Sequence, residues 1–302
     1  MAPDPTVDSA RDPGRRRFLT MIAGLSGLGA VAVATGGALT QGTAHPATGM
    51  AGGMSLGELL SGGMSRAVVR REQVWSEARG RNVGLVTLIP AGSYARRLPV
   101  CVVLHGRTGN SEEVTAAPMP DTLDATISAG GTPFAVMAVD GGDDYWHEHT
   151  KGDDSMGMLL REVPVWAAAR GLGMPEAAVG VSMGGFGALL YARRRREQGR
   201  PLRAVGAIAP ALILSWDEMS QRNAFHDEAD WASMDPLRNI PALGNVPVGI
   251  WCGTEDGFIE GARQFIEKAR PEVAELSPGG HTRAFFDSSV PPALAFVGRR
   301  LR

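Results

Sequence analysis

Short, almost entirely apolar segments recur along this 302-residue chain, and most of them end at a glycine, a proline or a polar residue. The compact apolar runs that predict strands are Val100–Leu104, Phe134–Val139, Ala177–Val181, Ala204–Ala209 and Val246–Cys252. Ala67–Trp75 and Asn82–Pro90 before them are predicted to be an opening pair of strands. Segments of helical length lie between them, notably Ser155–Arg170, Gly184–Gln198 and Ile259–Lys268. Apolar strands that alternate with helices predict an α/β fold with a mostly parallel central sheet and helices on both faces. In such folds, functional residues gather in loops at the carboxyl ends of the strands.

One of these strands leads into a serine motif. The segment Gly180-Val181-Ser182-Met183-Gly184 has the pattern Gly-x-Ser-x-Gly. This pattern is typical of a nucleophile elbow, a sharp strand-to-helix turn that exposes the serine hydroxyl, and its glycines leave room for the turn. The pattern also occurs at 53–57, but no predicted strand precedes Ser55. We therefore predict Ser182 as the nucleophile and interpret Ser55 as a chance match.

A serine hydroxyl becomes an effective nucleophile when a histidine accepts its proton and a carboxylate orients that histidine. In proteins with this elbow the chain order is serine, acid, histidine. Only His226 and His281 follow Ser182. We predict His281 as the base, because it lies in a glycine-rich loop near the C-terminus, whereas His226 precedes the expected acid. That acid is Asp256, just beyond the last predicted strand, with Glu255 as the open alternative if the loop is shifted by one residue.

The reaction also needs an oxyanion hole, which is a pair of N–H groups directed at the charge that develops on the carbonyl oxygen. The position after the nucleophile predicts the backbone N–H of Met183 as one donor. The loop Leu104-His105-Gly106-Arg107 predicts the backbone N–H of Arg107 as the other. His105 precedes the serine in the chain, so we interpret it as a structural residue of this loop.

The loop that follows Phe134–Val139 is rich in carboxylates and histidines. Their spacing fits neither a calcium-binding loop nor the zinc motif His-Glu-x-x-His, so we expect no metal. We predict a polar rim of the active site, with Tyr145, Trp146 and His147 as candidate substrate-binding residues. An ordinary surface loop is the alternative.

Several motifs together resemble the putative-esterase family of α/β-hydrolases, which includes S-formylglutathione hydrolases, feruloyl esterases and mycolyltransferases. They are Leu104-His105-Gly106, Asp140-Gly141-Gly142 with Tyr145-Trp146-His147, Gly180–Gly185, Cys252-Gly253-Thr254 with Asp256, and Pro278-Gly279-Gly280-His281. The resemblance implies an α/β-hydrolase fold over residues 66–302, a triad of Ser182, Asp256 and His281, and no cofactor. The segment between Pro210 and Pro236 departs from the family and leaves the substrate undefined.

Residues 1–47 have the layout of an export signal. The basic sequence Arg15-Arg16-Arg17-Phe18-Leu19 precedes an apolar run rich in glycine and alanine, and small residues close the segment. The arginine pair before Phe-Leu resembles a bacterial twin-arginine signal. We therefore expect the protein in the periplasm, in the cell envelope or secreted, with membrane contact only through the leader if it is not cleaved. Residues 48–65 are predicted to be a flexible linker, and 66–302 the catalytic domain.

The composition limits the partners. The net charge of -2 argues against a nucleic-acid-binding protein. Cys101 and Cys252 are predicted to be free thiols, because their strands are not expected to be neighbours. The predicted function is hydrolysis of a small or envelope-linked carboxylic ester through an acyl-enzyme. An acyltransferase that uses an envelope sugar hydroxyl is the alternative, and a non-catalytic envelope-binding module is a more remote one. The sequence leaves the oligomeric state open.

Overall fold

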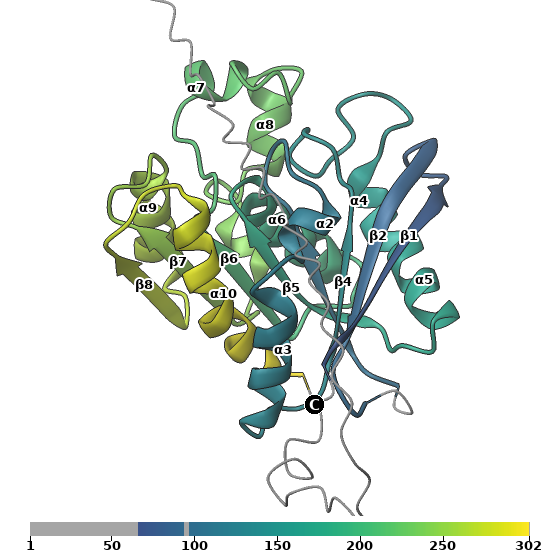
Figure 1. Cartoon of the computed structure of the whole chain (residues 1–302). Helices are drawn as coiled ribbons and strands as arrows, with labels where there is room; N and C mark the ends of the chain where they lie inside the picture. Colours follow the sequence, from purple (N-terminus) through teal and green to yellow (C-terminus); the bar gives the residue numbers. More distant parts are fainter. Residues whose placement is uncertain (1–65, 94–96, 302) are drawn as a thin grey trace, which may run out of the picture. The chain divides into compact units, whose positions relative to one another are not determined.

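The computed structural model describes residues 66–93 and 97–301. Their centre is one eight-stranded sheet in the order β1-β2-β4-β3-β5-β6-β7-β8 (Figure 1). The strands are β1 (Val68–Ser76), β2 (Arg81–Ile89), β3 (Val100–Leu104), β4 (Ala135–Val139), β5 (Pro175–Val181), β6 (Ala204–Ile208), β7 (Val248–Gly253) and β8 (Val273–Ser277). The pairs β1–β2 and β2–β4 are antiparallel, and every other pair is parallel.

Apolar layers cover both faces of this sheet, because successive strand residues point to opposite sides. In β3, Val102 and Leu104 belong to one layer, while Cys101 and Val103 belong to the other. The helices α5 (Val163–Ala169), α6 (Met183–Glu197) and α9 (Ile259–Ala269) contribute to the first layer. The helices α3 (Met119–Ser128) and α10 (Arg283–Gly298) pack side by side in the second (Figure 1). The predicted fold class is confirmed.

The segment predicted as one helix over 155–170 consists of three parts. They are α4 (Ser155–Gly157), the π-helical turn η1 (Met158–Glu162) and α5. Pro164 lies in the first turn of α5. It has no N–H to donate to the carbonyl four residues earlier, which disfavours a regular helix at this point.

The remaining helices are short. They are α2 (Ser111–Val114), α7 (Trp216–Ser220), α8 (Glu228–Met234) and the 3₁₀ turn η2 (Ile240–Leu243). Within the described part of the chain, no helix has both the length and the apolar character needed to cross a bilayer. The predicted export signal, the linker and Ser55 lie outside the described residues.

Both cysteines are free and buried, as predicted. Cys101 lies in β3 and Cys252 in β7, and the strands β5 and β6 separate them. Neighbouring strands are about 4.8 Å apart. The two residues are therefore too far apart for a disulfide, which requires Cα atoms within about 7 Å. Burial raises the pKa of the Cys101 thiol, and it raises that of Cys252 to about 12, so both thiols stay protonated at neutral pH.

The strand order brings the loops that build the site to one edge of the sheet. Because β3, β4, β5, β6, β7 and β8 run parallel, their carboxyl ends face the same way. The loops that begin at His105, Asp140, Ser182, Thr254 and Pro278 therefore emerge at the same side. This arrangement builds the site described next.

Candidate active site

Ser182 occupies a strained turn between β5 and α6. Its backbone angles are φ 58 and ψ -120, in a region that side-chain-bearing residues rarely adopt. The neighbouring strand holds this conformation, because the Ser182 N–H donates to the carbonyl of Ile208 at 2.9 Å. The Ser182 carbonyl in turn accepts from the N–H of Ala211 at 3.0 Å and from that of Gly185 at 2.8 Å. The predicted sharp turn from strand to helix is therefore present at Ser182.

The glycines of the motif are needed because backbone groups surround them. A Cβ on Gly180 would lie 1.9 Å from the carbonyl oxygen of Gly184. A Cβ on Gly184 would lie 2.1 Å from the carbonyl oxygen of Leu104. Real Cβ atoms do not approach backbone so closely, so any larger residue at either position would open the turn.

His281 lies between the serine and a carboxylate. Its Nε2 is 2.8 Å from Ser182 Oγ, and its Nδ1 is 2.7 Å from Asp256 Oδ2. The Asp256 side chain is fully buried, and its other oxygen accepts from the N–H of Phe258 at 2.8 Å. The His281 side chain retains 30% of its exposure, so the serine end of this chain of hydrogen bonds faces solvent.

The two alternatives in this region lie elsewhere. Glu255 is exposed, and its backbone N–H donates to the carbonyl of Gly279 at 3.0 Å. His226 is also exposed and packs against His149, with ring centroids 4.7 Å apart. The structure therefore brings Asp256 and His281 to Ser182, and neither Glu255 nor His226.

Two aromatic rings that the sequence did not single out hold the imidazole of His281. Phe258 and Phe286 each place their ring centroid 5.0 Å from that of His281, in edge-on geometry. Contact from two rings limits rotation of the imidazole and keeps it aligned with its two hydrogen-bond partners.

The predicted oxyanion donors lie beside the serine. Met183 begins α6, and the first N–H groups of a helix have no partner within the helix. Arg107 follows Gly106, where an added Cβ would lie 3.3 Å from Ser182 Cβ. Among the described residues, neither the Met183 N–H nor the Arg107 N–H donates to a protein group. Both N–H groups can therefore donate a hydrogen bond to a ligand oxygen.

Tyr145, Trp146 and His147 do not form the expected rim. Tyr145 and Trp146 are 1% and 0% exposed, and both belong to the apolar layer around α6. His147 is buried too, with Nε2 2.6 Å from the Ala224 carbonyl and its ring stacked on Phe225. Both aromatic residues have positive φ, 51 and 63, which turns the chain so that the rings point inward. Their position fits packing and not contact with a substrate.

A cavity of about 280 Å³ opens next to Ser182. One wall is the loop 105–109, and the other is formed by His281 and the start of α10. Apolar side chains that the sequence did not single out line its interior: Val114, Pro118, Met119, Val181, Phe286 and Val290. In the described part of the chain, no group of three or more His, Cys, Asp or Glu side chains is placed to hold a metal ion.

The serine turn and the order of the parallel strands are those of an α/β-hydrolase. The sequence agrees with this class, because the profile of the putative-esterase family matches residues 76–295. The chain belongs to that family and is a hydrolytic enzyme of the esterase type. No curated protein sequence matches the chain.

Solved structures of esterases share the fold. A ferulic acid esterase aligns with a TM-score of 0.66 and 17% identity, over 78% of this chain and 99% of its own. An S-formylglutathione hydrolase from Agrobacterium tumefaciens aligns with a TM-score of 0.64 and 18% identity, over 79% of this chain and 99% of its own. A fluorophosphonate-binding serine hydrolase from Staphylococcus aureus aligns with a TM-score of 0.60 and 18% identity, over 76% of this chain and 98% of its own.

The geometry predicts a different outcome for the two neighbouring carboxylates. Asp256→Asn should lower kcat by several orders of magnitude, because the carboxylate fixes the histidine tautomer and stabilises the imidazolium. Glu255→Gln should leave kcat within about twofold, because the Glu255 side chain is exposed and it is Asp256 that is hydrogen-bonded to His281. Steady-state kinetics with a chromogenic ester, alongside circular dichroism to check folding, will compare the two. An inactive Glu255→Gln with an active Asp256→Asn would contradict the assignment.

Proposed function

We propose that this enzyme hydrolyses carboxylic esters through an acyl-enzyme on Ser182, with His281 as general base and Asp256 as its orienting acid. The observation that carries the proposal is the continuous set of hydrogen bonds from Asp256 through His281 to Ser182, at 2.7 and 2.8 Å. A nucleophile, a base and an orienting group within these distances are what activation of a serine requires.

The reaction has two steps, formation of an acyl-enzyme and its hydrolysis. Ser182 Oγ attacks the ester carbonyl carbon while His281 Nε2 accepts the hydroxyl proton, and the carbonyl oxygen becomes an oxyanion that the N–H groups of Met183 and Arg107 stabilise. The intermediate expels the alcohol, which takes the proton from His281, and leaves the acyl group on Ser182. Water then attacks with the same proton transfers, which releases the acid and restores the serine.

The cavity supports a compact substrate group. Ligand pockets commonly have volumes of about 300–1,000 Å³, so this one is at the small end. Its apolar interior favours a short aliphatic acyl group or a single aromatic ring over a long chain. An acyltransferase would use the same triad, with a sugar hydroxyl in place of water, and the cavity itself favours neither acceptor.

We also propose that the enzyme acts outside the cytoplasm. The support is the arginine pair Arg15-Arg16 before Phe18-Leu19 and the apolar segment that follows. An exported location fits an enzyme that acts on a small ester from the environment or on an ester of the envelope.

Replacement of the nucleophile tests the proposed reaction. Ser182→Ala should reduce kcat by about 10⁴-fold or more, because no acyl-enzyme can form. Ser55→Ala, which changes the second Gly-x-Ser-x-Gly match, should have wild-type activity. A fluorophosphonate probe should add one covalent label to the Ser182 peptide, measured by mass spectrometry of the wild type, and none to Ser182→Ala. Activity retained in Ser182→Ala would overturn the proposal.

A series of p-nitrophenyl esters from acetyl to palmitoyl tests the cavity. We expect kcat/KM to be highest for short acyl groups and to fall for long ones. Ala116→Trp, at an exposed residue of the cavity wall, should move the optimum further toward acetyl. Val165→Trp, on the exposed face of α5, is the matched control and should keep the wild-type profile. A kcat/KM that rises steadily from acetyl to palmitoyl would contradict the proposal of a compact pocket. Acyl-sugar products in assays with added sugar would indicate a transferase.

Substitution of the arginine pair tests export. Arg15→Lys with Arg16→Lys should leave the protein in the cytoplasmic fraction, because twin-arginine export depends on that pair. Arg11→Lys, outside the pair, is the control and should be exported normally. Cell fractionation with immunodetection measures both. Normal export of the double variant would leave a general secretory signal or a membrane anchor as the explanation.

A further inference from the structure

We propose that His105 is a positioning residue that presets the oxyanion hole, and that the loop 140–146 fixes His105 in that role. The proposal rests on the proposed function above, because it assigns the Arg107 N–H to the oxyanion. It adds a second set of residues to the reaction, which act by positioning the Arg107 N–H.

The two ring nitrogens of His105 have opposite partners. Nδ1 lies 2.7 Å from the carbonyl oxygen of Gly106, which can only accept a hydrogen bond. Nε2 lies 2.8 Å from the backbone nitrogen of Gly141, which can only donate. The ring is therefore neutral and carries its proton on Nδ1. Burial lowers the pKa of His105, which agrees with this neutral form.

This tautomer determines how the Gly106–Arg107 peptide is oriented. The Gly106 carbonyl accepts from His105 Nδ1 and also from the N–H of Gly109 at 3.1 Å. In a trans peptide the C=O and N–H bonds point in opposite directions. Two donors that hold the carbonyl inside the loop therefore turn the Arg107 N–H outward, toward Ser182. A flipped peptide would instead place a carbonyl oxygen, which repels an oxyanion, on that side.

The loop 140–146 holds the oxyanion loop, residues 105–109, at three points. Besides the Gly141 bond to His105, the Asp143 carboxylate accepts from the N–H of Thr108 at 2.6 Å. Trp146 Nε1 donates to the carbonyl of His105 at 3.3 Å, and its ring packs on the imidazole with centroids 4.9 Å apart. This is the role that the structure gives to Trp146 in place of the expected substrate contact.

Glycines make room for this packing. A Cβ on Gly141 would lie 2.3 Å from the Trp146 ring, and one on Gly187 in α6 would lie 2.4 Å from it. The indole is thus enclosed between the loop 140–146 and α6, directly behind the serine turn.

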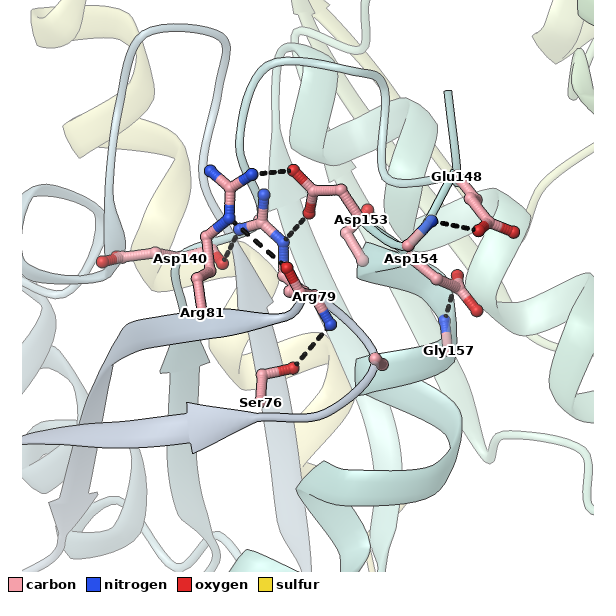
Figure 2. Close-up of polar contacts among 12 residues, drawn as sticks. Ser76, Arg79, Arg81, Asp140, Glu148, Asp153, Asp154 and Gly157 are labelled. Atoms are coloured by element: carbon pink, nitrogen blue, oxygen red, sulfur yellow. Dashed lines mark hydrogen bonds and ion pairs between the residues drawn. The ribbon is translucent and has the colours of Figure 1, made fainter. Parts of the chain in front are cut away.

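A buried ion pair anchors the start of the loop (Figure 2). Arg79, between β1 and β2, donates from Nη1 to the Asp140 carbonyl and from Nε to Asp153, both at 2.6 Å. The side chains of Arg79 and Asp153 are 5% and 12% exposed. The Asp140 carboxylate accepts from the N–H and the hydroxyl of Ser111 and from the N–H of Gly84. The backbone around Gly141 therefore has little freedom to move away from His105.

Two substitutions of His105 separate the functions of its ring nitrogens. Asn places an amide near the position of Nδ1, so His105→Asn can keep the donor to Gly106 and lose the acceptor for Gly141. Gln reaches the position of Nε2, so His105→Gln can keep the acceptor and lose the donor. We expect kcat to fall by about 10²–10³-fold in His105→Gln, as for loss of an oxyanion donor, with KM within a fewfold of wild type. His105→Asn should stay within about tenfold of wild type, since the Gly106 bond remains.

Inhibition by a trifluoromethyl ketone provides a readout that a merely structural role would not change. Its adduct with Ser182 carries an oxyanion, so its Ki should rise in His105→Gln in parallel with the loss of kcat. Equal losses in His105→Asn and His105→Gln, or an unchanged Ki in His105→Gln, would overturn the proposal. Thermal melting of each variant reports whether it is folded.

The exposed residue Asp143 offers a second test if both His105 variants fail to fold. Asp143→Ala removes the acceptor of the Thr108 N–H and should lower kcat severalfold and raise the Ki at an unchanged melting temperature. Asp144→Ala, at the neighbouring carboxylate, should match wild type. Identical kinetics for the two variants would contradict the proposed role of the loop 140–146.

The failure of this proposal can be distinguished from the failure of the proposed function. If the wild-type enzyme is neither active nor labelled at Ser182, the proposed function fails. If the wild type is active and only the effects predicted here are missing, the His105 proposal alone fails.

Discussion

The backbone conformation of Ser182 is the constraint on which the rest of the site depends. Its positive φ is unfavourable by itself, and hydrogen bonds to Ile208, Ala211 and Gly185 maintain it. The turn also requires that Gly180 and Gly184 have no side chains, because backbone atoms occupy that space. These contacts come from β5, β6, α6 and the end of β3, so the turn depends on the pairing of these three strands and on the packing of α6 against them.

The strand order explains why the supporting groups converge on this turn. In the sequence β4-β3-β5 across the sheet, the loop after β3 lies between the loop after β4 and the serine turn after β5. The oxyanion loop is therefore held from one side by residues 140–146 and faces Ser182 on the other. The loops after β7 and β8 bring Asp256 and His281, which are 25 residues apart in the chain, to the same edge.

Most of this arrangement could be predicted from the sequence, for physical reasons that particular residues illustrate. Strands buried on both faces appear as unbroken apolar runs, and Ser182 and His281 have few competitors in pattern and order. The sequence predicts Asp256 as the acid but leaves Glu255 open as the alternative, because a one-residue change of register in the loop exchanges them. α10 was not predicted, since Pro291 and Pro292 lie inside it. The inward direction of Tyr145 and Trp146 depends on two consecutive positive φ angles, which no sequence pattern indicates.

The misassigned aromatic residues point to how such a site is stabilised. Preorganised donors aid catalysis because they need not reorganise as charge develops, but a surface loop has little rigidity of its own. Here the rigidity comes from the interior, because the Trp146 ring fills the space left by two glycines and holds His105. The neutral His105 ring in turn donates to the Gly106 carbonyl and keeps it in place. A protonated His105 would lose its acceptor for the Gly141 N–H. Burial that lowers the pKa of His105 therefore keeps both hydrogen bonds intact, and with them the direction of the Arg107 N–H.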